Sequence, residues 1–173
     1  MPEPSPSCAP ILTLEEFARL RDDPAARLGR IVVTSGGFDP IHPGHVSCIV
    51  ESKIYGDTLV VIVNGDSFLK AKKGKPFQDL ATRAAIVSGI RGVDYVVTYE
   101  VENDSTVALA LRGVRPHVFT KGGDRLKGHS LPASEELACR ELGIEIIDSV
   151  GVGKAWSSSD FLREWGEFWK AKT

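Results

Sequence analysis

Two histidines, His42 and His45, stand three residues apart in the segment HPGH and are the side chains best suited to chemistry on an anion. At that spacing they lie on one side of a helical turn, so both can reach one phosphate group. Gly36 and Gly37 come shortly before them, and glycines let the backbone approach a ligand closely. Fixed donors of this kind stabilise the charge that builds on phosphate oxygens when the phosphorus is attacked. The segment therefore predicts a phosphate site.

The histidine pair has two other interpretations. One is the capped start of a helix with partly exposed side chains, and the other is a zinc site. Tetrahedral zinc needs four ligands, and no Cys, His or carboxylate elsewhere in the sequence is spaced to complete such a set. We therefore assign no protein ligands to a metal. The glycines and the strand-to-helix context favour the phosphate site.

Four lysines lie within six residues, at positions 70, 72, 73 and 75. Such a density usually marks a solvated surface loop. This loop follows a predicted strand, so we expect it to face the same edge of the sheet as the histidines. Ammonium groups on a flexible loop can close over a triphosphate and neutralise its charge as pyrophosphate leaves.

The elements that must position these side chains can be read from the hydrophobic pattern. From residue 30 onward, short β-branched runs alternate with helical patterns, which is typical of βαβ units and a parallel sheet. We expect an α/β fold, with a single Rossmann-like doubly wound domain of about five parallel strands in the order 3-2-1-4-5. The expected strands cover residues 31–34, 58–63, 95–98, 117–120 and 144–147, and the expected helices cover residues 43–55, 79–91, 105–112, 133–142 and 158–170.

Ligands of an open α/β sheet bind outside the carboxyl ends of its strands, so the loops there are expected to form the site. The first strand runs into the glycines and HPGH, and the fourth runs into the segment KGGD at residues 121–124. The final helix begins at a serine turn, residues 157–159, whose N–H groups also suit a phosphate. Simpler interpretations exist, because Gly and Asp are common in turns and serine is a common helix cap.

Both ends of the chain differ from the alternating strand and helix patterns between them. Four of the first ten residues are proline, so residues 1–11 are expected to form a disordered or extended tail before a domain at 12–173. Thr13 and Glu16 have capping-box spacing and predict a short N-terminal helix. In the final helix, Phe161, Trp165 and Phe168 recur at helical spacing, which we interpret as core packing.

Composition excludes several classes of protein. With 173 residues, 42% of them hydrophobic and 25% charged, the chain is expected to be an ordinary globular protein. Cys8, Cys48 and Cys139 are odd in number and widely spaced, which indicates thiols in a reducing compartment. A net charge of -2 argues against nucleic acid as a partner. The sequence lacks a long apolar run and a secretory signal, so we expect a cytoplasmic location and no membrane partner.

The residues described above resemble a known family. The segment GGFDPIHPGH at residues 36–45 matches the first signature of the HxGH nucleotidyltransferases, in the cytidylyltransferase-like superfamily. The resemblance continues through the segment NGD at residues 64–66, the lysine-rich loop, Arg83 and KGGD, and covers residues 31–163. KGGD and the helix before the first strand are most similar to the adenylyltransferase domain of ADP-heptose synthase. Glycerol-3-phosphate cytidylyltransferase is a more distant likeness.

The resemblance implies a nucleotidyltransferase that joins the nucleoside monophosphate of ATP or CTP to a sugar or polyol phosphate and releases pyrophosphate. Heptose 1-phosphate is the acceptor it favours. Glycerol phosphate or another small phosphate or phosphonate, with CTP as donor, stays open, as does a catalytically inactive nucleotide sensor. Mg²⁺ carried with the nucleoside triphosphate and a homodimer are also implied.

The same resemblance implies three groups of site residues. The catalytic group is His42, His45 and Lys72. The nucleotide-binding group is Gly36, Gly37, Phe38, Gly44, Gly123, Asp124, Ser157, Ser158 and Ser159. The acceptor-binding group is Asp39, Lys75, Arg83 and Lys121. Trp156, before the serine turn, departs from the pattern of the heptose enzymes, which have Ser-Thr-Thr-Asn at the turn itself.

Two rival families fit less well. The segment GVGK at residues 151–154 suggests a P-loop kinase, but a Walker A loop needs a glycine at position 148, where this chain has Asp148, and a hydroxyl residue in place of Ala155. An aminoacyl-tRNA synthetase shares the histidine signature, but 173 residues leave no room for a tRNA-binding extension.

Overall fold

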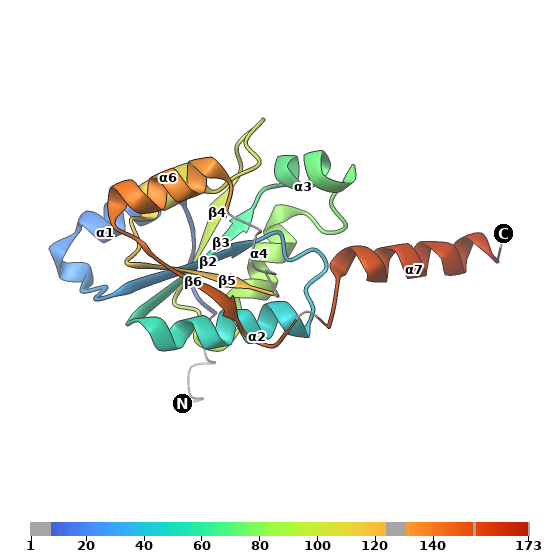
Figure 1. The fold of residues 1–173 in the computed structure, drawn as a ribbon, viewed down its shortest axis with the longest axis horizontal. Helices are drawn as coiled ribbons and strands as arrows, with labels where there is room; N and C mark the ends of the chain where they lie inside the picture. The colour runs from blue at the N-terminus through green and yellow to red at the C-terminus, as the bar shows by residue number, and fades with distance from the viewer. Residues whose placement is uncertain (1–7, 124–130, 154, 173) are drawn as a thin grey trace, which may run out of the picture.

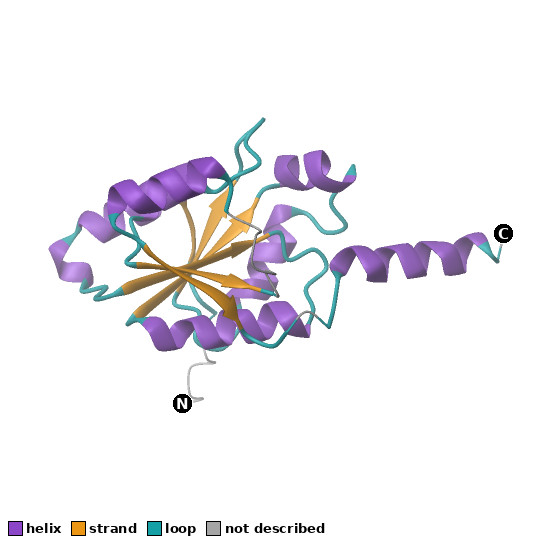
Figure 2. Cartoon of the chain, in the orientation of Figure 1, coloured by secondary structure: helices purple, strands orange, loops and turns teal. Residues whose placement is uncertain are grey.

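Six parallel strands form one sheet in the computed structural model, which describes residues 8–123, 131–153 and 155–172 (Figures 1 and 2). The strand order across the sheet is β1-β4-β3-β2-β5-β6. The strands are β1 (Ile11–Thr13), β2 (Ile31–Gly36), β3 (Thr58–Asn64), β4 (Tyr95–Tyr99), β5 (Val118–Gly122) and β6 (Glu145–Val150). All seven residues of β3 are buried, as expected for a central strand covered on both faces.

Helices cover both faces of the sheet, so the fold is doubly wound. The helices are α1 (Leu14–Asp22), α2 (Pro43–Ser52), α3 (Asp66–Lys73), α4 (Leu80–Ser88), α5 (Ala108–Val114), α6 (Ala133–Leu142) and α7 (Ser158–Lys170). Helices α1, α5 and α6 bury Phe17, Leu111 and Cys139 against one face. Helices α2 and α4 bury Ile49 and Val87 against the other. Alternate strand residues contribute to the two cores, because successive side chains of a strand point to opposite faces.

The structure confirms the predicted fold class and the order of the five predicted strands, which are β4-β3-β2-β5-β6. It adds β1 at one edge, where Ile11–Thr13 pairs in parallel with β4. The predicted tail 1–11 therefore ends in a strand, and the N–H of Ala9 donates to the carbonyl of Ser88 at 2.9 Å. Residues 1–7 lie outside the described part of the chain.

The predicted helices are confirmed with small changes at their ends. The capping box before α1 is present, because Thr13 Oγ1 accepts from the Glu16 N–H and the Glu16 carboxylate accepts from the Thr13 N–H. Helix α2 is followed by a 3₁₀ turn, Lys53–Tyr55. The helix and the turn together match the predicted helix at residues 43–55. Gly143 ends α6 in the left-handed region with φ 67°, where glycine avoids the strain of a side chain.

The prediction of a lysine-rich loop after β3 is wrong, because most of that segment is the helix α3. Its first N–H groups are held by the Glu100 carboxylate, which accepts from Asp66 at 2.5 Å and from Ser67 at 3.1 Å. Lys70, Lys72 and Lys73 lie in its last turn, where positive charge favours the helix dipole. The lysines are therefore held on a helix rather than on a free loop.

The prediction that α7 packs into the core is also wrong. Figure 1 shows α7 extending away from the sheet, and none of its residues is buried. Phe161, Trp165 and Phe168 are 42%, 59% and 44% exposed. The helix is amphipathic as predicted, but no described element covers its apolar side.

Candidate active site

A cavity of about 480 Å³ opens at the carboxyl ends of β2 and β5, beside the start of α2. It brings together nine of the predicted site residues, from four separate segments: Gly36, Gly37, Phe38, His42, Gly44, His45, Lys72, Lys121 and Gly123. This is the edge of the sheet where ligands of α/β proteins bind. Six predicted residues do not line it, namely Asp39, Lys75, Arg83, Ser157, Ser158 and Ser159.

His42 caps the N-terminus of α2. Its Nδ1 atom accepts a hydrogen bond from the backbone N–H of His45 at 3.3 Å, so in neutral His42 the ring proton is on Nε2. The two imidazoles are stacked, with ring centroids 3.6 Å apart and planes 15° apart. Pro43 occupies the first turn, where its missing N–H costs nothing. The helix start therefore presents two stacked imidazoles to the cavity.

The electrostatics of the cavity keep His45 neutral. Burial, with smaller effects of the neighbouring His42 and Lys72 in the same direction, lowers the pKa of His45 to about 4. Burial also lowers the pKa of His42. The Nδ1 atom of His45 is buried and has no hydrogen-bond partner among the described residues. A bound phosphate would supply a partner and stabilise the protonated form, so this histidine is suited to respond to an anion.

Lys72 and Lys73 are neighbours in sequence but differ in their surroundings. Lys72 is exposed and lines the cavity. Lys73 points to Asp39, with its Nζ atom 2.7 Å from Oδ2 and 2.5 Å from the backbone carbonyl. Lys75 is exposed beyond the end of α3 and does not line the cavity. The structure therefore brings Lys72, and not Lys75, to the histidines.

Asp39 is buried behind the cavity and its carboxylate is fully used within the protein. It accepts from the N–H groups of Phe77 and Gln78 at 2.7 and 2.8 Å, in addition to Lys73. Burial alone would raise the pKa of Asp39, but Lys73 and the two N–H donors outweigh burial and hold the pKa below its usual value. The acceptor-binding role predicted for Asp39 therefore has no support in the geometry. Its carboxylate instead holds the loop after α3.

The same holds for Arg83, whose predicted role was to bind the acceptor phosphate. Its side chain is fully buried. The guanidinium donates to the carbonyls of Gly37 and Asn64 at 2.8 and 2.6 Å and to Asp66 Oδ1 at 2.7 Å. A further N–H donates to the Gln78 carbonyl at 3.0 Å. Arg83 thus joins the loops after β2 and β3 instead of facing a ligand, and the sequence could not show which way it points.

Lys121 lies at the end of β5 and lines the cavity. Its Nζ atom is 3.4 Å from Glu135 Oε2 and 4.3 Å from the centre of the Phe119 ring. The side chain is 13% exposed, so this charge is held in place at the cavity wall. Gly123 follows it in the lining, and Asp124, predicted to bind nucleotide, lies outside the described residues.

The serine turn at the start of α7 lies close to the cavity but uses two of its hydroxyls internally. Ser157 Oγ accepts from the Asp160 N–H at 3.3 Å as a helix cap. Ser158 Oγ donates to the carbonyl of Pro40 at 2.7 Å, which ties α7 to the loop before α2. Ser159 is exposed. These serines are thus placed as caps and anchors, and nucleotide binding by them stays a prediction.

Several lining residues were not predicted. They are Thr34, Ser35, Cys48, Gly122, Val152, Gly153, Ala155 and Trp156. The segment after β6 could have been found from its position, because it follows the carboxyl end of a strand. The segment GVGK within it resembles part of a P-loop, and that resemblance does not predict a place beside the histidines.

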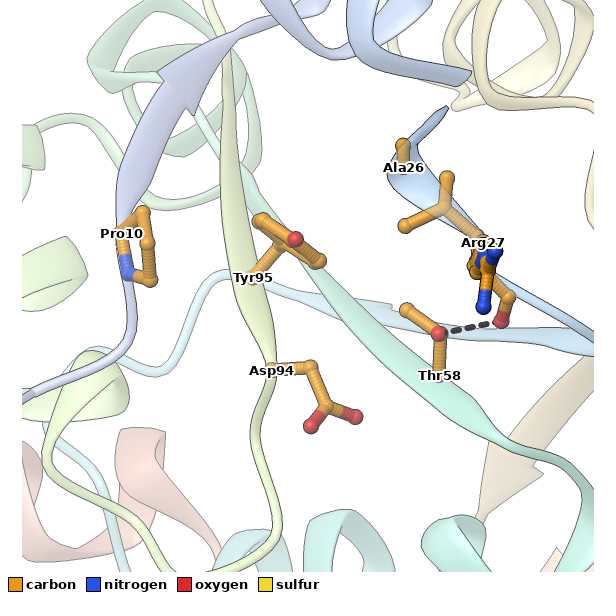
Figure 3. Close-up of a pocket in the computed structure, with 7 residues that line it drawn as sticks. Pro10, Ala26, Arg27, Thr58, Asp94 and Tyr95 are labelled. Atoms are coloured by element: carbon orange, nitrogen blue, oxygen red, sulfur yellow. Dashed lines mark hydrogen bonds between the residues drawn. The ribbon is translucent and has the colours of Figure 1, made fainter. Parts of the chain in front are cut away.

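A second hollow lies at the opposite, amino-terminal end of the strands (Figure 3). Pro10, Thr58, Asp94 and Tyr95 line it together with residues 26–28. Two of its polar side chains are already paired: Thr58 donates to the Leu28 carbonyl, and Asp94 accepts from Lys53 and from the Leu59 N–H. None of the predicted site residues lines this hollow.

Residues 8–123, 131–153 and 155–172 contain no cluster of three or more His, Cys, Asp or Glu side chains that could hold a metal ion. Over those residues, no helix has the length and apolar character needed to cross a membrane.

Comparison with known proteins places the site in a family context. The cytidylyltransferase-like family matches residues 33–164. The bifunctional protein HldE of Methylococcus capsulatus is 41% identical over 104 residues, which are 58% of this chain and 21% of that protein. HldE of Hahella chejuensis is 37% identical over 153 residues, 87% of this chain and 29% of that protein. The chain thus spans less than a third of the length of these relatives.

A solved structure is also similar. The lipopolysaccharide core biosynthesis protein of Thermoplasma volcanium is 30% identical, with a TM-score of 0.58. The match covers 72% of this chain and 98% of that chain. The family match, which covers residues 33–164, includes the segment HPGH with both histidines.

Proposed function

Because the chain belongs to the cytidylyltransferase-like family, we propose that it transfers the nucleoside monophosphate of ATP or CTP to a sugar or polyol phosphate, releasing pyrophosphate. The observation that carries this proposal is the stacked pair His42 and His45 at the N-terminus of α2, open to a cavity that Lys72 also lines. Stacked neutral imidazoles, helix N–H groups and a lysine form a donor set for polyphosphate.

The chemistry follows from these donors. An oxygen of the acceptor phosphate attacks the α-phosphorus in line, and the bond to the pyrophosphate oxygen breaks. The acceptor phosphate is already ionised at neutral pH, so no side chain has to remove a proton from it. His42 and His45 donate hydrogen bonds to the α-phosphate oxygens as their charge grows, and Lys72 neutralises the departing pyrophosphate.

Mg²⁺ fits this site as a companion of the nucleotide. The ion would neutralise phosphate charge there, and Mg²⁺ typically takes most of its ligands from phosphates and water. The described residues supply no three-ligand cage that would hold it alone. Removal of Mg²⁺ with a chelator is therefore expected to abolish turnover.

Heptose 1-phosphate is the favoured acceptor, with ATP as donor. Its support is the likeness to the HldE relatives and to a lipopolysaccharide core biosynthesis protein. Lys121 is the cation best placed to bind the acceptor phosphate, because it alone of the four residues predicted for that role lines the cavity. We also propose a cytoplasmic location and a homodimer.

The test is a turnover screen. Purified protein is mixed with each of the four nucleoside triphosphates and a panel of sugar, heptose and glycerol phosphates, and pyrophosphate release is measured. The proposal expects release with ATP and heptose 1-phosphate. Release only with CTP and glycerol phosphate would favour the cytidylyltransferase alternative. Nucleotide binding without release for any pair would identify an inactive sensor and reject the proposed reaction.

A further inference from the structure

One wall of the cavity differs chemically from the rest. Val152, Gly153, Ala155 and Trp156 contribute to it, and these described residues carry no charge. The other walls carry His42, His45, Lys72 and Lys121. A nucleoside triphosphate has the same division, because its phosphates are anionic and its base is a flat, largely apolar ring.

The segment that carries Trp156 is anchored on both sides. Before it, Gly151 packs directly on α2, and a Cβ atom there would lie 2.7 Å from the backbone nitrogen of Cys48. The N–H of Val152 donates to Ser47 Oγ at 3.0 Å. After it, the bond from Ser158 to Pro40 fixes the start of α7. Both anchors lie on the loop and helix that hold the histidines.

The indole of Trp156 lies beside the histidine segment. A Cβ atom built on Gly44 would lie 3.6 Å from Trp156 Cε3 and 3.2 Å from the His42 ring. The glycine therefore leaves room for both rings at the mouth of the site. Among the described residues, none stacks on this indole or hydrogen-bonds its N–H, although the ring lines the cavity. The half-buried ring at the cavity wall therefore has a face on which a ligand can stack.

We propose that Trp156 binds the base of the nucleoside triphosphate by stacking, while the histidines and lysines bind its phosphates. This assignment rests on the proposed function and names the part of the site that holds the nucleoside. Stacking on an aromatic side chain tolerates different bases, because every base has a π face. The size of the stacked surface favours a purine, which agrees with ATP as the donor.

Binding measurements test this division of the site. Calorimetry is performed with ATP and, separately, with inorganic tripolyphosphate, which has the phosphates but no base. Trp156→Leu should weaken ATP binding roughly ten-fold or more, as loss of one stacked base does, and leave tripolyphosphate binding unchanged. Trp156→Phe keeps an aromatic ring and should stay within about three-fold of the wild type. Trp165→Leu, on the exposed side of α7, is the matched control and should change neither affinity.

Fluorescence gives a second readout. In a Trp165→Phe, Trp169→Phe background, Trp156 is the one remaining tryptophan of the chain. ATP should quench its emission in a saturable way, and tripolyphosphate should not. Equal loss of ATP and tripolyphosphate affinity in Trp156→Leu, or unchanged ATP affinity, would overturn the assignment. These measurements need no turnover, so a failed acceptor screen would reject the reaction without deciding the role of Trp156.

Discussion

Two polar clusters lie at the carboxyl edge of the sheet, and they differ in how their charges are paired. The cavity-facing cluster is His42, His45 and Lys72, and it lines an open space of about 480 Å³. The buried cluster is Asp39, Lys73 and Arg83, none of which lines that space. Arg83 is 0% and Asp39 is 3% exposed. Lys72 and Lys73 are adjacent in sequence, yet they belong to different clusters.

The difference shows that some residues of one family signature face a ligand site, while others hold the surrounding loops in place. Every group of the buried cluster already has protein partners: Arg83 joins the loops after β2 and β3, and Asp39 holds Lys73 and the loop after α3. The cavity-facing cluster keeps capacity for a ligand, as the unpaired Nδ1 of His45 shows among the described residues. Substitutions should therefore change stability in the buried cluster and turnover in the cavity-facing cluster.

The largest effect is expected from Arg83→Met. It leaves three backbone carbonyls and the Asp66 carboxylate without their donor, which should lower the free energy of unfolding by about 3–5 kcal/mol. Urea denaturation measures this loss. Arg112→Met is the matched control, because Arg112 forms an exposed ion pair with Glu141 and should cost about 0.5 kcal/mol or less. A stable Arg83 variant with a raised KM for the acceptor would restore the original ligand-binding interpretation.

The next effect is expected from the histidines. His45→Ala should lower kcat roughly 10²- to 10³-fold, because one preorganised donor to the transition state is lost. His42→Asn should lower kcat in the same way while keeping the cap on α2, since Asn is also a good N-cap residue. Urea denaturation checks that both variants stay folded. Normal turnover in both would remove the cavity-facing cluster from the mechanism.

The adjacent lysines provide the sharpest comparison. Lys72→Ala should raise the KM for ATP roughly ten-fold, since a charged contact to phosphate is lost. Lys73→Ala should leave the KM for ATP nearly unchanged and lower the free energy of unfolding by about 1–3 kcal/mol, because Asp39 loses a partner. Steady-state kinetics and urea denaturation are performed on both. The reverse assignment of effects would show that α3 is turned the other way.

The smallest effect is a dependence of stability on pH. His45 has a folded-state pKa of about 4, below the ordinary histidine value of 6.5, so the unfolded chain binds a proton first as the pH falls. The contribution of His45 is therefore complete above pH 6.5 and is lost as the pH falls toward 4. Denaturation curves across this range should show a smaller loss of stability in His45→Gln than in the wild type. Identical curves would mean that the His45 ring is not shielded from water.

The sequence predicted the sheet well because buried strands carry long apolar runs, as in β3, and turn residues separate them. It missed β1, which has three residues and follows a proline-rich stretch. It missed α3 because a high density of lysine is typical of loops. The direction of Arg83 could not be predicted, since a helix arginine is usually exposed and burial depends on carbonyls from other segments. The pattern of α7 revealed an apolar side but not whether the chain covers it.

The most direct test of the proposed reaction is ³¹P NMR of the wild-type protein with ATP, Mg²⁺ and heptose 1-phosphate. Attack at the α-phosphorus predicts equal amounts of pyrophosphate and of a new diphosphate ester, as ATP and the sugar phosphate disappear. The His45→Ala variant should form both at a rate at least roughly 100-fold lower. Formation of ADP, or of free phosphate in place of pyrophosphate, would contradict nucleotidyl transfer and show that the cavity directs attack to a different phosphorus.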